Sequence, residues 1–248
     1  MIETIPVAAP ARTVAAALAE PWLLRRGLAP FRVHATVDQL AAGDEVELFR
    51  WPVRLRVDQA DEHGLLLTGP VRLRATVVPS AIGAQLTCEI SLPVPLRMVR
   101  ALLIAVRDRA EQLAEAPVVV GAAIVAGGLV FTAQRDRPPV AAGRWEFPGG
   151  KVEPGEDERV ALARECKEEL AVDVLVGDRL GPDLVLANGW VLRLYLARLA
   201  AGTEPDQLHA GEHRAQRWLA ADQLHDVAWL NADRVVLPGL RAALNPDR

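Results

Sequence analysis

The stretch GKVEPGEDERVALARECKEELAV, residues 150–172, decides the fold of the second half of this chain. If residues 158–170 form a helix, Glu165, Glu168 and Glu169 have the spacing i, i+3 and i+4 and share one face. The opposite face is apolar and is predicted to anchor the helix to a sheet; it consists of Val160, Ala163 and Leu170, with Cys166 at its margin.

The shared acidic face predicts a metal site. Three clustered carboxylates repel one another, and a surface helix gains nothing from placing them together. Hard oxygen donors at this density suit Mg²⁺ or Mn²⁺, which also bridge to substrate phosphates. The alternative is a solvated acidic face, which is common on helices, but the preceding loop, Phe147-Pro148-Gly149-Gly150, favours the metal.

These residues match the Nudix box: a glycine, five residues, a glutamate, seven residues, then Arg-Glu-apolar-any-Glu-Glu-any-Gly-apolar. One position departs, because Ala171 replaces the last glycine, where it is expected to tighten or strain the turn out of the helix. Six fixed positions match by chance only about once in 10⁷. The chain therefore resembles the Nudix hydrolase superfamily through Gly150, Glu156, Arg164, Glu165, Cys166, Glu168, Glu169 and Val172.

The resemblance implies a metal shell. Glu165, Glu168 and Glu169 would bind Mg²⁺ or Mn²⁺, and the backbone carbonyl of Gly150 would complete the shell. Glu165 would also deprotonate or orient the attacking water. Bound cations would neutralise the polyphosphate and lower the pKa of a water molecule.

Further roles follow from the same resemblance. Arg164 and Glu156 would form a supporting ion pair that fixes the loop and orients Glu165. Family members often take another glutamate from a later loop as ligand or base. Glu212 is our candidate for it, and the adjacent His213 is the rival.

Residues 118–244 resemble one branch, the MutT-like (deoxy)nucleoside triphosphate pyrophosphohydrolases. The resemblance rests on AQRDRPPVAAGRWEFPGGKVEPGE, with a basic pair, Arg135 and Arg137, and an aromatic-acid-aromatic run ending at Phe147. Arg135 occupies the place of a phosphate-binding arginine; otherwise it is a surface residue at a strand end. Such relatives attack the β-phosphorus and release monophosphate and pyrophosphate, which implies nucleotide-pool sanitation.

The segment WLNADRVVLPGL resembles the one whose Asn or Asp meets the base edge. Asp233 falls there and would accept hydrogen bonds from cytosine or guanine, which fits dCTP, 5-methyl-dCTP or 8-oxo-dGTP. Asp233 could instead cap the final helix. Phe147 and Trp229 could stack on the base, or belong to the core.

The first 115 residues show a different pattern. A strand (3–7) and a helix (11–19) precede runs that alternate apolar and polar residues, with turn-forming pairs between them such as Pro79-Ser80. A long amphipathic helix of about 20 residues follows Pro95. The alternating runs are Val33-Ala35-Val37, Val53-Leu55-Val57, Val71-Leu73-Ala75 and Leu86-Cys88-Ile90.

This order resembles the helix-grip fold of the START-like or polyketide-cyclase-like superfamily, an antiparallel sheet around its last helix. That fold often encloses an apolar ligand cavity, although a filled core fits the pattern equally. The predicted architecture is therefore a helix-grip domain (1–115) followed by an α/β/α-sandwich Nudix domain (116–248).

Composition narrows the partners. The 248 residues are 51% hydrophobic and have a formal net charge of −4, so we expect no nucleic-acid polymer as a partner. We find no signal peptide and no apolar run of about 20 residues, and expect a cytoplasmic protein without membrane contact. The alternative to an enzyme is a nucleotide-sensing regulator with an apolar-ligand-binding N-terminal domain, but the complete set of box carboxylates favours the enzyme.

Overall fold

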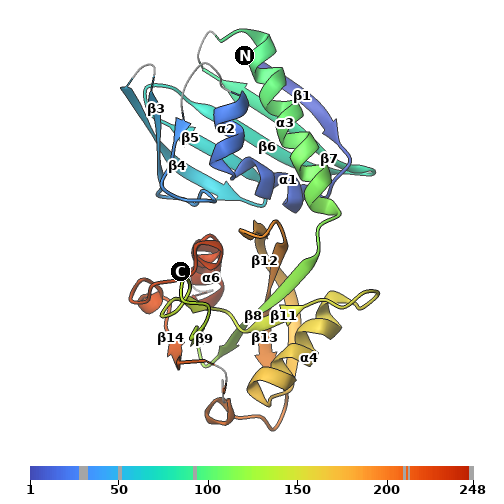
Figure 1. Cartoon of the computed structure of the whole chain (residues 1–248), viewed down its shortest axis with the longest axis vertical. Coiled ribbons are helices and arrows are strands. Elements are labelled where there is room, and N and C mark those ends of the chain that lie inside the picture. Colours follow the sequence, from blue (N-terminus) through green and yellow to red (C-terminus); the bar gives the residue numbers. More distant parts are fainter. Residues whose placement is uncertain (28–32, 50–51, 92–93, 209–210, 212, 246–248) are drawn as a thin grey trace. The chain divides into compact units, whose positions relative to one another are not determined.

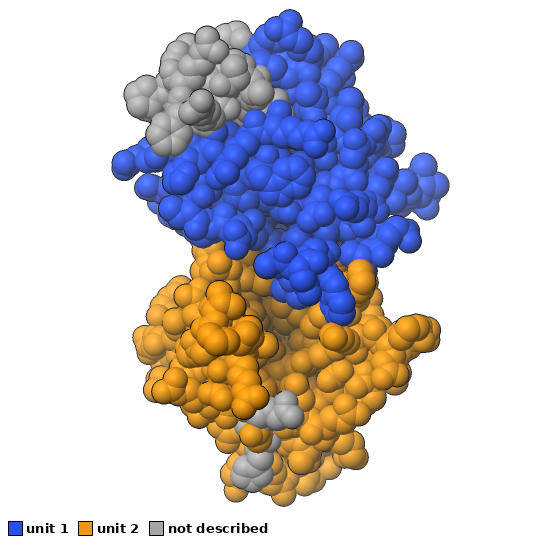
Figure 2. Space-filling view, viewed as in Figure 1, with its two compact units in different colours: residues 1–116, 181–190 blue, residues 117–180, 191–248 orange. Residues whose placement is uncertain are grey.

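The computed structural model describes residues 1–27, 33–49, 52–91, 94–208, 211 and 213–245. The chain forms two compact units (Figure 2): unit 1 comprises Met1–Ala116 and Gly181–Trp190, and unit 2 comprises Pro117–Leu180 and Val191–Arg248. The predicted division at residue 115 did not anticipate that residues 181–190 belong with unit 1. Of the helices in the described ranges, none has the length and apolar character of a membrane span.

Unit 1 is built on one seven-stranded antiparallel sheet with the order β1-β7-β6-β5-β4-β3-β2 (Figure 1). Its helices are α1 (Ala11–Leu18), α2 (Pro21–Gly27) and α3 (Leu96–Ala114). The strands are β1 (Ile2–Val7), β2 (Val33–His34), β3 (Glu45–Phe49), β4 (Pro52–Asp61), β5 (Gly64–Thr68), β6 (Leu73–Ser80) and β7 (Gly83–Ile90). Helix α3 packs on α1, α2 and the β1–β7 side of the sheet.

The sequence predicted α1, α3 and most of this sheet, with four differences. The run Val33-Ala35-Val37 forms only the two-residue β2, because a bend begins at Thr36. Val71 lies before β6, and Pro79-Ser80 ends that strand instead of forming the turn. Strands β3 and β5 and helix α2 were not predicted; β5 is a run of leucines without alternation, which the period-two criterion misses.

Buried polar contacts hold residues 181–190 in unit 1. Asp183 is fully buried, and its carboxylate accepts a 2.7 Å hydrogen bond from the hydroxyl of Thr13. The side chain of Gln39 accepts from the backbone N–H of Val185 at 3.0 Å. Because a buried carboxylate is costly without partners, this segment depends on α1 for its stability.

Unit 2 is built on mixed β-structure. The strand order is β10-β9-β8-β13-β12, with β11 paired to β8 and β14 paired to β9; β8 and β13 are parallel. The strands are β8 (Val118–Ala126), β9 (Leu129–Gln134), β10 (Trp145–Glu146), β11 (Gly149–Lys151), β12 (Val174–Val185), β13 (Val191–Leu199) and β14 (Ala215–Leu219). The helices are α4 (Glu158–Leu170), α5 (Asn231–Arg234) and α6 (Leu237–Leu244), with 3₁₀ turns at Pro205–Gln207 and Gln223–His225.

Helix α4 has the predicted bounds, but its faces differ from the prediction. Leu162, Cys166 and Leu170 are fully buried in the core with β8 residues, whereas Val160 is 59% exposed. At 100° per residue, Glu165 and Glu169 fall within the arc on that buried side and not opposite it. The side chains of Glu165 and Glu169 lie against Gly150 and Gly149 of β11. The prediction that Val160 anchors the helix was wrong.

Candidate active site

The ends of α4 are fixed by local interactions. The side chain of Asp157 caps the first turn by accepting hydrogen bonds from the backbone N–H groups of Arg159 and Val160, at 2.9 and 3.3 Å. At the other end Ala171 adopts the left-handed conformation, with φ 57° and ψ 26°. The position where the Nudix box has glycine therefore needs a conformation that disfavours alanine.

Glu165 and Gly150 touch where α4 meets β11. A Cβ added to Gly150 would lie 2.2 Å from both the carboxyl carbon and one carboxylate oxygen of Glu165. No real side chain tolerates that distance, so glycine is required for Glu165 to occupy this place. The sequence-predicted ligand and the backbone of the loop are thus neighbours.

Arg164 is the centre of an ion-pair network. Its guanidinium donates to both oxygens of Glu156, at 3.1 and 3.0 Å, so the predicted ion pair is present. It also donates to Glu165 at 2.9 Å, to Glu168 at 3.2 Å and to the Lys151 carbonyl at 3.1 Å. Arg164 thereby connects the loop to two of the three predicted metal ligands.

The network shifts the acidity of its members. The hydrogen bonds from Arg164 lower the pKa of Glu156, and a backbone hydrogen bond from Glu153 acts in the same direction. Hydrogen bonds to Glu156 and then to Glu165 raise the pKa of Arg164. Both shifts favour the charged forms, so the pair keeps its charges at neutral pH.

Glu169 is held by a backbone hydrogen bond, whereas Glu165 and Glu168 accept from Arg164. Glu169 is half-buried, and one oxygen accepts a 3.3 Å hydrogen bond from the backbone N–H of Gly149. Burial raises its pKa, and the negative charges of Glu165 and Glu146 add to this effect, while His213 and the Gly149 hydrogen bond oppose it. A cation beside Glu169 would relieve both the burial cost and the repulsion.

The donor set fits a hard divalent cation. The described residues include no cluster of three or more His, Cys, Asp or Glu side chains arranged to hold a metal. Glu165 and Glu168 are paired with Arg164 instead, while Glu169 lacks a cationic hydrogen-bonding partner among the contacts above. Glu165 lies against Gly150 and Glu169 against Gly149, and carboxylate and carbonyl oxygens are the ligand type that Mg²⁺ and Mn²⁺ use.

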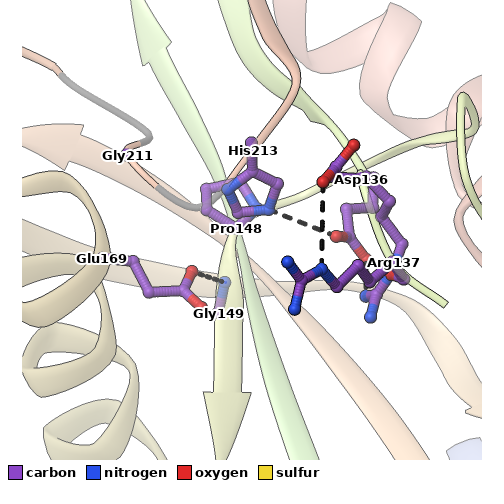
Figure 3. A pocket seen from close by; sticks show the side chains of 9 residues that line it. Asp136, Arg137, Pro148, Gly149, Glu169, Gly211 and His213 are labelled. Atoms are coloured by element: carbon purple, nitrogen blue, oxygen red, sulfur yellow. Dashed lines mark hydrogen bonds and ion pairs between the residues drawn. The ribbon is translucent and has the colours of Figure 1, made fainter.

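A cavity of about 500 Å³ lies next to Glu169 (Figure 3). In the figure, Glu169 reaches from α4 toward Gly149, and His213 comes from the segment before β14. Arginines and carboxylates both line the cavity, so it suits a ligand that carries negative charge and binds cations. Among described residues the lining is Arg135, Asp136, Arg137, Glu146, Pro148, Gly149, Glu169, Gly211 and His213.

Arg135 follows β9 and is not a free surface cation. Its Nη1 donates to Oε2 of Glu146 at 2.6 Å, and its Nε donates to the Arg137 carbonyl at 2.9 Å. The other oxygen of Glu146 lies 3.3 Å from Nε2 of His213. Sequence reasoning noted Glu146 as the acid of the aromatic-acid-aromatic run but assigned it no role, although its place between the buried Trp145 and Phe147 directs its side chain to the opposite face.

Phe147 and Asp233 are buried together. The Phe147 ring packs on Trp229 with ring centroids 4.9 Å apart, and both rings are buried. The backbone N–H of Phe147 donates to Asp233 at 3.2 Å. The two rings thus pack on each other, and stacking of either ring on a base stays a prediction.

Asp233 is 2% exposed and is the third residue of α5, not its cap, which is Leu230. The final helix is α6, whose N-cap is Val236, so the alternative that Asp233 caps the final helix was wrong. Burial raises the pKa of Asp233 to about 7, against the lowering effect of the Phe147 hydrogen bond. Glu212, the candidate for the later glutamate, lies outside the described residues.

Comparisons with known proteins identify the family of the second half of the chain. A model of the NUDIX domain matches residues 115–240. A Mycobacterium tuberculosis protein named "Putative 8-oxo-dGTP diphosphatase 2" is 51% identical over 131 residues, which are 52% of this chain and 90% of that protein. The CTP pyrophosphohydrolase of Escherichia coli is 36% identical over 135 residues, which are 52% of this chain and 96% of that protein.

Solved structures are also similar to about half of this chain. The solution structure of the Escherichia coli ORF135 protein covers 53% of this chain and 92% of its own, with 33% identity and a TM-score of 0.44. The match to a MutT NUDIX hydrolase from Burkholderia pseudomallei covers 50% of this chain and 98% of that protein, with 31% identity and a TM-score of 0.38.

Proposed function

Because this chain belongs to the NUDIX domain family, we propose that it hydrolyses a (deoxy)nucleoside triphosphate to the monophosphate and pyrophosphate. A role in nucleotide-pool sanitation is supported by relatives that are named for 8-oxo-dGTP and CTP. The observation that carries the proposal is the contact of Glu165 with Gly150, beside a cavity that also presents two arginines, Arg135 and Arg137. The cavity thus has both carboxylates that could bind a cation and arginines that could bind phosphates in its lining.

Mg²⁺ or Mn²⁺ is the proposed cofactor. Glu165, Glu168, Glu169 and the carbonyl of Gly150 would hold it, as the donor set allows. When bound, the cation neutralises phosphate charge and lowers the pKa of a water molecule. Glu165 would orient or deprotonate the attacking water, and Glu212 is the other candidate for the base.

The remaining site residues would position these groups. Arg164 holds Glu165 and Glu168 through hydrogen bonds and is itself fixed by Glu156. Preorganised polar groups stabilise the transition state because they need no rearrangement during the reaction. Arg135 would bind the phosphates, since it reaches the cavity at the end of β9.

Asp233 and Phe147 are the proposed base-recognition residues. A pKa of about 7 means that the Asp233 carboxyl can accept or donate a hydrogen bond at neutral pH. The names of the relatives support cytosine or an oxidised guanine as the base, and hence dCTP, 5-methyl-dCTP or 8-oxo-dGTP as substrates. Asp233→Ala is expected to change base preference more than it changes hydrolysis of a poor substrate, and equal losses for all bases would refute the recognition role.

The experiment is a product analysis of the full chain with dCTP, 5-methyl-dCTP, 8-oxo-dGTP and ADP-ribose, with and without Mg²⁺. The proposal predicts Mg²⁺-dependent release of monophosphate and pyrophosphate from at least one triphosphate. Turnover of ADP-ribose alone would contradict the substrate class. No turnover of any nucleotide would favour a nucleotide sensor.

For residues 1–115 we propose a helix-grip domain. Support comes from the element order, in which a strand and two helices precede six antiparallel strands and the long α3 that packs on β1 and β7. An apolar fluorescent probe such as a labelled fatty acid tests for a ligand cavity. Saturable binding would support an open cavity, and no binding would support a filled core.

A further inference from the structure

The strand register brings together three polar side chains from distant segments. Glu146 on β10 lies opposite Ala133 of β9, and Arg135 follows the end of β9. On the other edge of β9, the backbone N–H of Arg214 donates to the Gln134 carbonyl at 2.8 Å, which brings the preceding His213 to the same end. The arrangement is therefore fixed by backbone pairing.

Glu146 is bound on both of its oxygens. Oε2 accepts from Arg135 at 2.6 Å, and Oε1 lies 3.3 Å from Nε2 of His213. The Glu146 side chain is 13% exposed and the His213 side chain 10%, so water competes little for these contacts. Glu146 is thus committed to two protein partners instead of facing the cavity as a free carboxylate.

These contacts restrict Arg135 without using up its donors. An arginine has five N–H donors, and Arg135 uses its Nε and Nη1 groups on the Arg137 carbonyl and Glu146. The contacts described leave three N–H groups, and the side chain lines the cavity. A guanidinium held at two points loses less rotamer entropy when it binds a phosphate.

We propose that Glu146 and His213 are positioning residues that hold Arg135 in the orientation in which it binds a substrate phosphate. This inference rests on the proposed function. Glu146 acts through Arg135, and His213 acts through Glu146, so neither residue needs to touch the nucleotide. The competing role is direct contact of Glu146 with the nucleotide.

Steady-state kinetics of the full chain with dCTP and Mg²⁺ test the proposal. If dCTP is not turned over, another triphosphate that is hydrolysed in the product analysis replaces it. Glu146→Gln is expected to raise KM about tenfold, the effect of losing one charged hydrogen bond, with kcat changed less than about twofold. Asp178→Asn is the matched control because Asp178 is an exposed carboxylate on β12 of the same unit. It should leave both constants unchanged. A fall in kcat without a rise in KM for Glu146→Gln would overturn the proposal.

A double-mutant comparison separates positioning from direct contact. In an Arg135→Ala background, Glu146→Gln should raise KM no further, because the group through which it acts is gone. A second increase of similar size would show that Glu146 contacts the nucleotide itself and would overturn the proposal. His213→Ala should raise KM less than Glu146→Gln does, and His213→Gln, which keeps a donor for Glu146, should restore the wild-type value.

A readout independent of turnover distinguishes this inference from the proposed function. The ¹⁵N–¹H signal of the Arg135 Nε group, assigned with Arg135→Lys, should be slow to exchange with solvent in the wild type. Glu146→Gln and His213→Ala should both accelerate that exchange, and circular dichroism checks that they fold. If no nucleotide is hydrolysed but exchange accelerates, the proposed function fails and the positioning pair stands. Unchanged exchange in both folded variants would overturn the positioning pair.

Discussion

The carboxylate of Glu165 occupies the space where a side chain at position 150 would begin. The hypothetical Cβ of Gly150 lies 2.2 Å from the carboxyl carbon of Glu165. The first glycine of the box and the first glutamate of its acidic triplet are therefore one packing unit, although 15 positions separate them in the sequence.

Gly150→Ala is expected to abolish most of the activity, because the new methyl group must displace Glu165 or the loop. We expect kcat/KM to fall by at least about 100-fold, as in other cases where a misplaced group costs catalysis. The measurement is kcat/KM for the best substrate. Gly239→Ala in α6 is the control, since its added Cβ meets only Leu180 at 3.5 Å, an ordinary contact. Equal activity of the two variants would contradict the packing argument.

Glu168→Gln is expected to lower turnover by at least about 100-fold while the fold stays intact. Glu168 is 61% exposed and its ion pair with Arg164 is partly solvated, so its charge contributes little to stability. The loss would come from a weaker metal shell. Asp173→Asn, which removes another exposed carboxylate, is the control. Kinetics and urea unfolding check both variants, and wild-type turnover in Glu168→Gln would count heavily against the metal site.

Ala171→Gly is expected to stabilise the protein by about 1 kcal/mol. Ala171 has a φ of 57°, and this left-handed conformation costs an L-residue roughly 1–2 kcal/mol, part of which the greater chain entropy of glycine offsets. Urea unfolding measures the change. Ala163→Gly, inside α4, should destabilise by about 1 kcal/mol. A destabilised Ala171→Gly variant would show that the turn is not strained.

Asp233 predicts a pH dependence of stability. Burial raises its pKa from 3.8 to about 7, so the folded state takes up a proton that the unfolded state has released between these values. The contribution of Asp233 to the free energy of unfolding is complete below about pH 4 and is lost as the pH rises to about 7. Asp233→Asn should therefore be more stable than the wild type at pH 8, by a few kcal/mol at most, and should lack this slope. Urea unfolding of both proteins at pH 5 and pH 8 measures this difference. If Asp233→Asn keeps the wild-type dependence of stability on pH, the raised pKa of Asp233 is contradicted.

Sequence reasoning found the elements that have strong local signals. The bounds of α4 were predicted because a regular run of helix formers begins after Asp157 and ends before Ala171. Strand β5 and helix α2 were missed because their residues show neither alternation nor a long amphipathic repeat. The place of residues 181–190 in unit 1 depends on Asp183 and Thr13, which are 170 positions apart and have no local signature.

The candidate site was predicted as a set of residues but not as an arrangement. The box spacing identified Glu165, Glu168 and Glu169, yet periodicity alone placed them opposite the buried face, whereas the structure places Glu165 and Glu169 beside it. The position of Glu146 beside Arg135 depends on the register of β10 with β9, and no local sequence pattern encodes that register. The arrangement of the site residues therefore depends on strand pairing and helix packing between segments that are distant in the sequence.

Mn²⁺ binding to the nucleotide-free protein, followed by electron paramagnetic resonance, most directly tests the central claim that Glu165 and Glu169 bind a divalent cation. The wild type should remove the six-line signal of free Mn²⁺, and Glu165→Gln and Glu169→Gln should leave much of it in place at the same concentrations. A wild-type protein that leaves the free signal unchanged, or variants that bind Mn²⁺ as tightly as the wild type, would contradict it.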